Sequence, residues 1–381
     1  MSERVFWAPG RVEISGNHTD HQRGRVLAAA IDLNATCIAS VNRTDYAVIE
    51  SDGFGETVVD LSDLAPRRHE IGTTAALIRG VAAWFSGNGY PFGGFDGHVT
   101  SDIPVGMGLS SSAAFEVLIG NVIKGLFNAD ISNLEIALAG QFAENMYFGK
   151  PCGLMDQTSS SFGGMSQIDF FDPLRPIVKP ISANLEGFSI CVVASGDSHE
   201  DLTDEYAAIP AEMKLIASYF GKPDLRAVAR EEFNASIGKL RSLGDRAILR
   251  AMHFFEENER VLRQSSALET DNIPEFMRLL TESGRSSLGY LQNLYSLANP
   301  SRQGLTLALA LCEQILRGDG AYRVHGGGFA GTLLAIVPDG MKDSFIDQMS
   351  YIFGNGCCRF LKIQREGGHE LVMGSDNHEQ E

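Results

Sequence analysis

The sequence has few basic residues and no long apolar run, and each absence argues against a class of protein. Lysine and arginine number 31 against 48 aspartates and glutamates, which gives a net charge of −17. Nucleic acids are bound by clustered basic residues, so we expect no nucleic acid partner. No stretch approaches the roughly 20 apolar residues of a transmembrane helix, and the first residues lack the apolar segment of a secretory signal. We therefore expect a cytoplasmic protein with no membrane partner, and we expect it to be a monomer.

Cysteine is sparse and scattered. The six cysteines form no Cys-x-x-Cys pair, and only the last two are adjacent; they are Cys37, Cys152, Cys191, Cys312, Cys357 and Cys358. Closely spaced pairs mark zinc sites, and dense cysteine frameworks mark small secreted domains. The pattern argues against both and favours reduced thiols.

At 381 residues the chain is long for one domain, and its 44% hydrophobic content is enough for a substantial core. We place one domain at 1–186 and a second at 187–373. A polar, acidic tail follows at 374–381, which we expect to be disordered. No internal repeat or low-complexity block interrupts this division.

Hydrophobic periodicity predicts a mixed α+β fold. Short β-branched runs dominate 4–60, and polar residues punctuated by glycine predict a loop at 8–22. The predicted helices span 74–85, 113–126, 132–148, 203–219, 244–264, 272–283, 285–298, 302–317 and 341–353. Further strands are predicted at 95–100, 165–170, 177–179, 188–194, 333–337, 360–363 and 370–372.

One stretch reads as a strand, a glycine turn and a helix start. The strand at 95–100 is followed by Gly106 and Gly108, and then by the serines 110–112, where a helix N-cap would fall. Unpaired N–H groups and the positive end of the helix dipole suit a phosphate at such a turn. An ordinary capped helix after a flexible loop is the alternative.

Two isolated carboxylates stand out further along the chain. Glu144 shares a stripe with the apolar face of the helix predicted at 132–148, where an unpartnered carboxylate would be costly. It is therefore either a rim residue or a ligand for something positive. Asp156 is surrounded by glycines and small hydroxyl residues, and it is either a helix cap or a carboxylate that accepts a proton from a substrate hydroxyl.

The polar segment near the N-terminus offers a further candidate. His18, Asp20 and His21 place three possible metal ligands within four residues. No second ligand cluster is obvious elsewhere in the sequence, which argues against a zinc-type site. Polar side chains on glycine-flanked loops beside a sheet are also a common form of ligand site.

Taken together, the motifs resemble those of the GHMP-type small-molecule kinases, and most closely those of galactokinases. Five segments match in the family's order, at 10–20, 104–113, 143–145, 152–157 and 326–331. One such match would be weak, but five in order over nearly the whole chain are strong. The resemblance implies an ATP- and Mg²⁺-dependent kinase that phosphorylates the anomeric hydroxyl of galactose. It also implies an N-terminal ribosomal-protein-S5-like domain, a ferredoxin-like C-terminal α+β domain, and an active site in the cleft between them.

The resemblance further implies a role for each matching residue. Asp156 would face the anomeric hydroxyl, and Arg11 the γ-phosphate. Ser112 and Glu144 would hold Mg²⁺. The ATP phosphates would be cradled by Gly106, Met107, Gly108, Leu109, Ser110, Ser111 and Ser112. The sugar would be bound by Asn17, His18, Thr19, Asp20, Gly153 and Tyr206, although the match around Tyr206 is short.

Elementary chemistry supports these roles, because phosphoryl transfer depends on positioning and on neutralising negative charge. The chain has no Walker A lysine, so that charge must be met by the helix dipole, Mg²⁺ and Arg11. An acid near an arginine should keep a low pKa, so Asp156 should be ionised.

Three departures from the galactokinase pattern concern the sugar. Asn17 stands where galactokinases usually have a glutamate that meets the C6 hydroxyl. The residues after Asp20, His21 and Gln22, resemble those of plant galacturonokinases, and 299–303 lacks an acidic segment typical of galactokinases. Galacturonate, or another sugar with the same 1-kinase chemistry, is therefore an alternative substrate. A non-catalytic sensor of sugar and ATP is an alternative of a different class.

Overall fold

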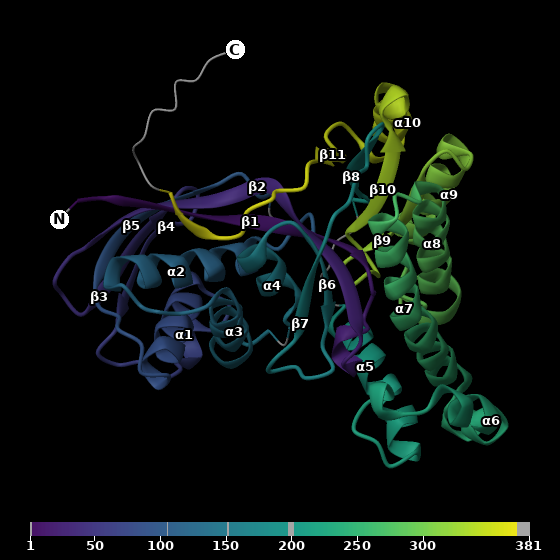
Figure 1. Cartoon of the computed structure of the whole chain (residues 1–381), viewed down its shortest axis with the longest axis horizontal. Coiled ribbons are helices and arrows are strands. Elements are labelled where there is room, and N and C mark those ends of the chain that lie inside the picture. The colour runs from purple at the N-terminus through teal and green to yellow at the C-terminus, as the bar shows by residue number, and fades with distance from the viewer. Residues whose placement is uncertain (1, 105, 151, 197–201, 372–381) are drawn as a thin grey trace.

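The computed structural model describes residues 2–104, 106–150, 152–196 and 202–371. The chain forms two halves, each built of a sheet and helices, which lie beside each other along the long axis (Figure 1). The predicted α+β class is confirmed. The tail predicted at 374–381 lies outside the described residues. None of the helices in the described part of the chain combines the length and the hydropathy needed to cross a bilayer.

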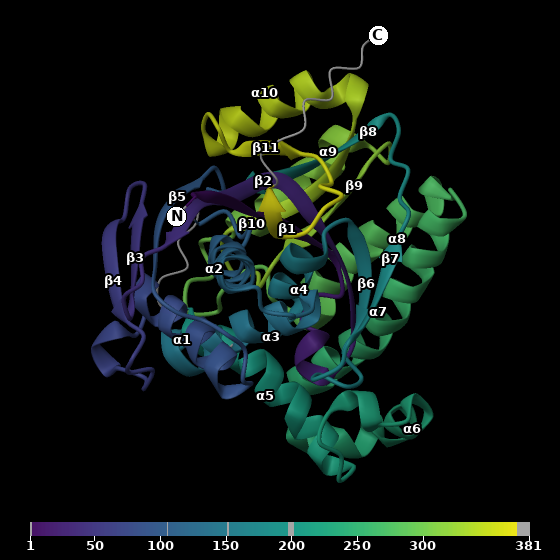
Figure 2. The same cartoon turned by 60° about the vertical axis from the view of Figure 1, so that its left-hand side comes forward.

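An eight-stranded sheet forms the N-terminal half, with the order β12-β1-β2-β5-β3-β4, and with β6 paired to β2 and β7 paired to β6. Its strands are β1 (Arg4–Ser15), β2 (Arg25–Val41), β3 (Tyr46–Ser51), β4 (Gly55–Asp60), β5 (Phe95–Ser101), β6 (Met165–Asp169), β7 (Ile177–Ile181) and β12 (His369–Leu371). Its helices are α1 (Thr74–Gly87), α2 (Ser111–Phe127), α3 (Asn133–Ala143) and α4 (Met155–Phe162). These helices lie together on one side of the sheet (Figures 1 and 2).

Apolar side chains fill the space between this sheet and its helices. Phe6 and Ile49 from the strands pack with Ile78, Phe85 and Ile119 from the helices, and all of them are fully buried. Such burial is the main stabilising contribution to a layered fold. It fixes the start of α2, and hence the glycine turn that precedes it, against the end of the sheet.

A four-stranded antiparallel sheet forms the C-terminal half, with the order β11-β8-β10-β9. Its strands are β8 (Phe188–Ala194), β9 (Ala321–His325), β10 (Thr332–Pro338) and β11 (Cys358–Leu361). Its helices are α5 (Thr203–Tyr219), α6 (Arg230–Leu240), α7 (Asp245–Glu269), α8 (Ile273–Ser286), α9 (Gly304–Leu316) and α10 (Lys342–Phe353). Short helical turns at 20–22, 68–70, 144–148, 225–227, 241–243, 287–291 and 339–341 complete the chain.

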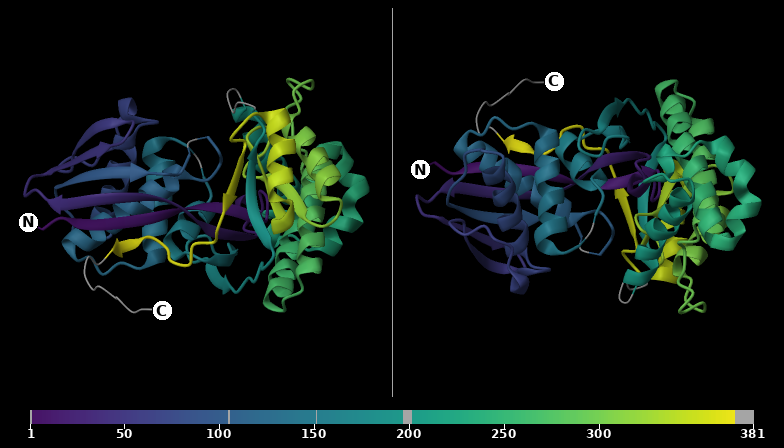
Figure 3. Two further views of the ribbon diagram at one scale, coloured as in Figure 1. Left: turned by 90° about the horizontal axis from the view of Figure 1, so that it is seen from above. Right: turned by 90° about the horizontal axis from the view of Figure 1, so that it is seen from below.

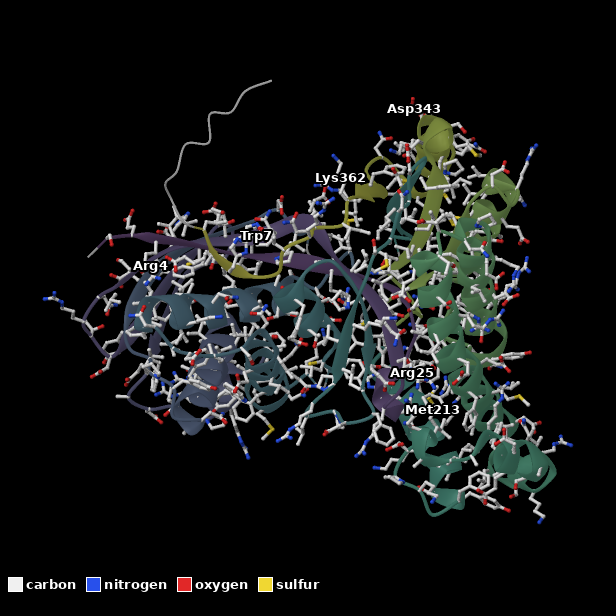
Figure 4. The ribbon with its side chains drawn as sticks, in the orientation of Figure 1. Arg4, Trp7, Arg25, Met213, Asp343 and Lys362 are labelled. Carbon is white, nitrogen blue, oxygen red and sulfur yellow. The ribbon has the colours of Figure 1, made fainter. Side chains whose placement is uncertain are left out.

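The two halves are joined by packing and by the path of the chain. One buried cluster combines Val12 and Leu27 of the first sheet with Phe276 and Leu280 of α8 and Leu334 of β10. In Figure 4, Arg4 and Trp7 lie at the outer end of the long strands, whereas Arg25 lies near the place where the sheet meets the helices. Segments far apart in sequence are therefore held together at this junction.

The last strand returns to the first half. β12 pairs with β1, Val5 opposite Leu371, so the yellow end of the chain lies beside its purple beginning (Figure 3). The boundary that we predicted between 186 and 187 falls just before β8. Residues 369–371, which we assigned to the second domain, are built into the first sheet.

The loop predicted at 8–22 is wrong in its first half, because residues 8–15 belong to β1. They are polar at several positions, yet they pair with β2 and are buried. The register shifts between Pro9 and Arg11 and again between Glu13 and Ser15. Such bulges redirect side chains and occur beside functional sites. Here they flank Arg11.

Three further assignments in the C-terminal half differ from the structure. The helix predicted at 285–298 is confirmed only as far as 291: α8 continues into a π-type turn at 287–291, which ends at Gln292 in a left-handed conformation. The segment that follows is irregular as far as α9. The sequence reasoning missed α6, which buries only Phe233 and Leu240 and so has little apolar periodicity. It also missed β9, whose five residues are all buried.

Candidate active site

Arg11 and Asp156 form a direct ion pair, although they are 145 positions apart. Arg11 Nε donates to Asp156 Oδ1 at 2.7 Å and Nη2 donates to Oδ2 at 2.6 Å, the two-point geometry that strengthens such pairs. Burial alone would raise the pKa of Asp156. The charge of Arg11 and the hydrogen bonds from Arg11 and Ser110 outweigh burial, and the pKa lies below its usual value. The expected low pKa is confirmed. Asp156 is ionised at neutral pH and able to accept a proton.

The glycine turn before α2 folds back onto this ion pair. Gly106, Gly108 and Ser110 all have positive φ, at 85°, 68° and 58°, a conformation that favours glycine. Ser110 occupies the N-cap position, but its hydroxyl donates to Asp156 and makes no cap hydrogen bond to the helix. The first N–H groups of α2 therefore have no side-chain cap and remain available to an anion. Arg11 Nη1 also donates to the Gly108 carbonyl.

Ser112, in the first turn of α2, meets Glu144. Ser112 Oγ lies 3.3 Å from Glu144 Oε1. Glu144 begins the π-type turn that follows α3, and its carboxylate is almost completely buried. Glu144 is therefore not a rim residue, and its role as a ligand stays a prediction. Two oxygens at this separation suit a hard cation, because Mg²⁺ is bound by few protein oxygens together with substrate phosphates and water. Within the described ranges, no group of three or more His, Cys, Asp or Glu side chains could hold a metal ion by itself.

Asp20 lies directly over Gly153. A Cβ atom at Gly153 would come within 1.9 Å of Asp20 Oδ2, so only glycine leaves room for this carboxylate. Thr19 is fully buried, and its Oγ1 lies within hydrogen-bond distance of two carbonyl oxygens, that of Gly16 at 2.8 Å and that of Arg25 at 2.5 Å, which share its single O–H. Thr19 thus shapes the segment, whereas Asp20 closes over the loop that leads to Asp156.

Asn17 lies at the centre of a buried hydrogen-bond network. Its Nδ2 donates to Glu13 Oε1 at 3.1 Å and to the Gly326 carbonyl at 2.7 Å. Its Oδ1 accepts from Asn293 Nδ2 at 2.8 Å and from Ser287 Oγ at 3.4 Å. An amide has two N–H donors and two acceptor lone pairs. All four are used by protein groups, and only 1% of Asn17 is exposed.

Three successive glycine carbonyls hold the residues predicted to bind sugar. Asn17 donates to Gly326, and His18 Nε2 lies 2.9 Å from the Gly327 carbonyl. Tyr206 Oη donates to the Gly328 carbonyl at 2.8 Å. Burial lowers the pKa of His18 to about 3, so its imidazole is neutral and its Nε2 carries the proton given to the carbonyl. The glycine motif therefore connects residues from both halves.

The structure brings together every predicted site residue that it describes, in two adjoining groups. One group contains Arg11, Asp156, Ser112, Glu144 and the turn at 106–110, and the other contains the sugar candidates. Sequence reasoning missed Glu116, Gln157 and Asn293. Glu116 lies one helical turn after Ser112, and Gln157 directly follows Asp156, so both had a positional signal. Asn293 had none, because it falls in a segment predicted to be helical.

Comparison with known proteins follows the same division of the chain. The family model described as GHMP kinases N terminal domain matches residues 75–164, which include the glycine turn, Glu144 and Asp156. The model described as galactokinase galactose-binding signature matches residues 1–41, which include Arg11 and Asn17.

The similarity extends over most of the chain. A galactokinase of Actinobacillus pleuropneumoniae is 32% identical over 339 residues, which cover 88% of this chain and 85% of that protein. A galactokinase of Glaesserella parasuis serovar 5 (strain SH0165) is 32% identical over 346 residues, or 89% and 86%.

Solved structures agree with these relatives. Lactococcus lactis galactokinase complexed with galactose superimposes with a TM-score of 0.81 at 25% identity, over 97% of this chain and 95% of that chain. A mevalonate kinase with a TM-score of 0.66 at 15% identity, over 95% and 99%, shares the fold. The predicted GHMP kinase fold is confirmed. With its ion pair, its uncapped helix start and its full-length relatives, the chain belongs to the galactokinase family of GHMP kinases and is an ATP-dependent sugar kinase.

Proposed function

We propose that this kinase transfers the γ-phosphoryl group of ATP to the anomeric hydroxyl of D-galactose, with Mg²⁺, to give galactose 1-phosphate. One observation carries the proposal: an ionised Asp156 is held by Arg11 and Ser110 against the uncapped start of α2. A group that accepts a proton thus adjoins a group that binds phosphate. Phosphoryl transfer requires this proximity of acceptor and donor.

Asp156 accepts a hydrogen bond from the anomeric hydroxyl of the sugar. This hydrogen bond orients the hydroxyl so that a lone pair of the sugar oxygen points at the phosphorus. Because the transition state of phosphoryl transfer is loose, the proton moves late, and a carboxylate of low pKa is a sufficient acceptor. Arg11 keeps Asp156 ionised before transfer. Its guanidinium then lies beside the negative charge that spreads over the transferred group.

The start of α2 supports the nucleotide. The N–H groups of residues 106–112 and the helix dipole face the ATP phosphates. Ser112 and Glu144 are the residues that would hold Mg²⁺, which supplies neutralisation of the phosphate charge when bound. The N–H groups, the helix dipole and Mg²⁺ would together supply the positive charge that a Walker A lysine provides in other kinases.

The proposed sugar-binding part of the site consists of Asn17, His18, Thr19, Asp20, Gly153 and Tyr206. Asp20 is the most direct candidate for a sugar contact, because it lies over Gly153, three residues before Asp156. His18 also has a buried Nδ1 atom that finds no hydrogen-bond partner among the described residues. With Nε2 as the donor, this Nδ1 is an acceptor for a sugar hydroxyl. Asn17 acts chiefly by holding its neighbours in place.

The alternative substrate, galacturonate, was suggested by the absence of a charge at Asn17. A C6 carboxylate needs hydrogen-bond donors, yet both N–H groups of Asn17 donate to protein acceptors. One of these acceptors is the carboxylate of Glu13, at 3.1 Å. This arrangement favours a sugar hydroxyl over a carboxylate. We therefore keep galactose as the proposed substrate.

The test is a coupled assay of ADP release over a panel of hexoses that includes galactose and galacturonate. We expect turnover of galactose and a loss of about 10²–10⁴-fold in kcat for Asp156→Ala, the range for a general base. Asp172→Ala, at an exposed acid outside the site, is the matched control and should retain activity. No turnover of any galactose-configured sugar would overturn the proposal and favour the sensor hypothesis.

We further propose that the chain acts in the cytoplasm as a monomer of two domains that divide between 186 and 187, with β12 from the C-terminal part completing the first sheet. All six cysteines are free thiols, which is the usual state in a reducing compartment. We expect light scattering to give a molar mass in solution of 41.3 kDa, that of a single chain. A mass twice that value would contradict the monomer.

A further inference from the structure

A second polar cluster lies behind the candidate metal ligand, and the proposed reaction does not use it. Gln157 Nε2 donates to Glu116 Oε2 at 2.9 Å and to Glu144 Oε2 at 3.0 Å. An amide nitrogen carries two hydrogens, and the two carboxyl oxygens are their nearest acceptors; Cys152 Sγ lies further away, at 3.7 Å. Gln157 and Glu116 are completely buried, and Glu144 is 3% exposed.

The three side chains come from three helical segments that converge at one glycine. Glu116 lies on α2, Glu144 begins the π-type turn after α3, and Gln157 lies on α4. A Cβ atom at Gly140 would come within 3.0 Å of Glu116 Cβ and 3.1 Å of Gln157 Cγ, so this glycine allows the helices to close. The π-type turn interrupts the regular helix, as such turns often do at functional sites.

The geometry gives different partners to the two oxygens of Glu144. Oε2 accepts from Gln157 on the buried side. Oε1 lies 3.3 Å from Ser112 Oγ, on the side of the glycine turn. Ser112 and Glu116 are four residues apart on α2 and therefore lie on the same face of that helix. One helix thus carries both the partner of Oε1 and the anchor behind Oε2.

This arrangement is costly for stability alone. Two neighbouring buried carboxyl groups share an amide, and an apolar cluster of equal volume would pack without that cost. Glu116 Oε1 and Gln157 Oε1 are buried and find no hydrogen-bond partner among the described residues. Such unpaired atoms call for an explanation beyond folding. Holding a metal-binding carboxylate in one orientation is such an explanation.

We propose that Gln157, anchored by Glu116, is a positioning residue that holds Oε2 of Glu144 and thereby turns Oε1 toward Ser112 and the cation of the nucleotide complex. The proposal rests on the function proposed above. Hydrogen-bonded partners of a metal ligand typically contribute 10–100-fold to metal affinity. Gln157 acts in this way on Glu144 and touches neither the sugar nor the phosphates.

The test variant is Gln157→Met, which keeps the length of the side chain and removes both N–H donors. The affinity for a non-hydrolysable ATP analogue is measured by calorimetry without Mg²⁺ and at a fixed concentration of free Mg²⁺. We expect the metal-free affinity to be unchanged, because the glycine turn is intact, and the gain from Mg²⁺ to fall 10–100-fold. In the rate assay, the Mg²⁺ requirement should rise while the KM for sugar stays constant.

Gln264→Met is the matched control. Gln264 is also completely buried, on α7, and neither of its amide atoms has a hydrogen-bond partner within the described residues. Its substitution removes a buried glutamine away from Ser112 and Glu144, so the dependence on Mg²⁺ should not change. A merely structural role for Gln157 would weaken analogue binding with and without Mg²⁺ alike.

A second pair of variants keeps the proposal testable if Gln157→Met does not fold. Glu116→Gln retains an oxygen that accepts from Gln157, whereas Glu116→Met removes the anchor. We expect Glu116→Met to reduce the gain from Mg²⁺ several-fold and Glu116→Gln to restore most of it. An unchanged gain in both Gln157→Met and Glu116→Met would overturn the proposal. Absence of sugar phosphorylation in the wild type would instead overturn only the proposed function, because analogue binding is measured separately.

Discussion

Two buried clusters of acidic residues lie in this molecule, and they differ in what faces the acids. At the junction of the halves, Glu13 lies 2.8 Å from Arg323 Nη2, and Glu257 contacts Arg260. Behind the glycine turn, Glu116 and Glu144 share the amide of Gln157. Among the described residues, one basic side chain lies within 4 Å of the carboxyl groups of Glu116 and Glu144. It is Lys150, whose Nζ is 3.7 Å from Glu144 and whose side chain is 68% exposed.

The difference separates a structural cluster from a functional one. Acids that face arginines are compensated within the protein and need nothing further. Glu144 instead faces the Gln157 amide, the Ser112 hydroxyl and an exposed lysine, which compensate it only weakly and leave it suited to an incoming cation. The comparison thus supports the metal role of Glu144 without reference to relatives, and the following changes test it.

Glu257→Ala should have the largest effect on stability. Glu257 Oε1 accepts from Ser15 Oγ at 2.9 Å and from the Gly16 N–H at 3.0 Å, and the carboxylate pairs with Arg260. Its removal leaves a buried arginine uncompensated, which costs about 3–5 kcal/mol of unfolding free energy. Urea denaturation measures this loss. Glu259→Ala, at an exposed neighbour on the same helix, should change stability by less than about 0.5 kcal/mol.

Glu257 and Glu116, one acid from each cluster, should respond to pH in opposite directions. Burial raises the pKa of Glu257, but the charges of Arg260, His253 and Arg323 outweigh it and lower the pKa from 4.5 to about 2. Its contribution is present above pH 4.5 and is lost as the pH falls towards 2, which amounts to about 3 kcal/mol at 1.36 kcal/mol per pKa unit. Glu257→Gln should flatten the acid limb of the stability curve. An unchanged limb would contradict the assignment.

For Glu116 the sign is reversed. Burial first, and then the charge of Glu144, raise its pKa well above 4.5. The contribution of Glu116 to the free energy of unfolding is therefore fully present below pH 4.5, and it declines as the pH rises towards the pKa of Glu116 in the folded state. Glu116→Gln, which has no charge to bury, should stabilise the metal-free protein, and more at pH 8 than at pH 5. Thermal unfolding at the two pH values measures this, and a uniform destabilisation would show that Glu116 is a compensated structural acid.

Asn293→Ala tests the hydrogen-bond network around Asn17, which adjoins Glu13. Asn293 Nδ2 donates to Asn17 Oδ1 at 2.8 Å and to the Gly327 carbonyl at 3.0 Å. Its loss leaves buried acceptors unsatisfied, at about 1–3 kcal/mol of stability. Because the glycine carbonyls also hold His18 and Tyr206, we expect the KM for galactose to rise more than kcat falls. A variant with normal KM would separate this network from the sugar.

The sequence predicted the site better than it predicted the surrounding network. The motifs that contain Arg11, Ser112, Glu144 and Asp156 follow one another in the order known for the family. The structure brings these four residues together. The network could not be predicted, because its hydrogen bonds join residues as far apart as Asn17 and Asn293. Such contacts depend on tertiary packing, and no local pattern records them.

Errors in secondary structure had the same origin. Residues 8–15 contain glycine, proline and buried charged side chains, and their strand is stabilised by pairing with β2 and by burial of both faces. The segment at 285–298 has helical periodicity. Its chain leaves the helix at Gln292, and the Asn293 carbonyl then accepts from Phe329 N–H at 2.5 Å. In both places a tertiary contact overrides local propensity.

Lys150→Met should have the smallest effect, and it tests whether Lys150 compensates Glu144. An exposed lysine 3.7 Å from a carboxylate contributes about 0–1 kcal/mol, because water and salt screen the pair. We therefore expect little change in urea denaturation and little change in the Mg²⁺ requirement. A loss of several kcal/mol would mean that Glu144 already has its cation and that the two clusters are of one kind. A small effect leaves Glu144 as a buried acid whose strong positive partner has to come from the substrate complex.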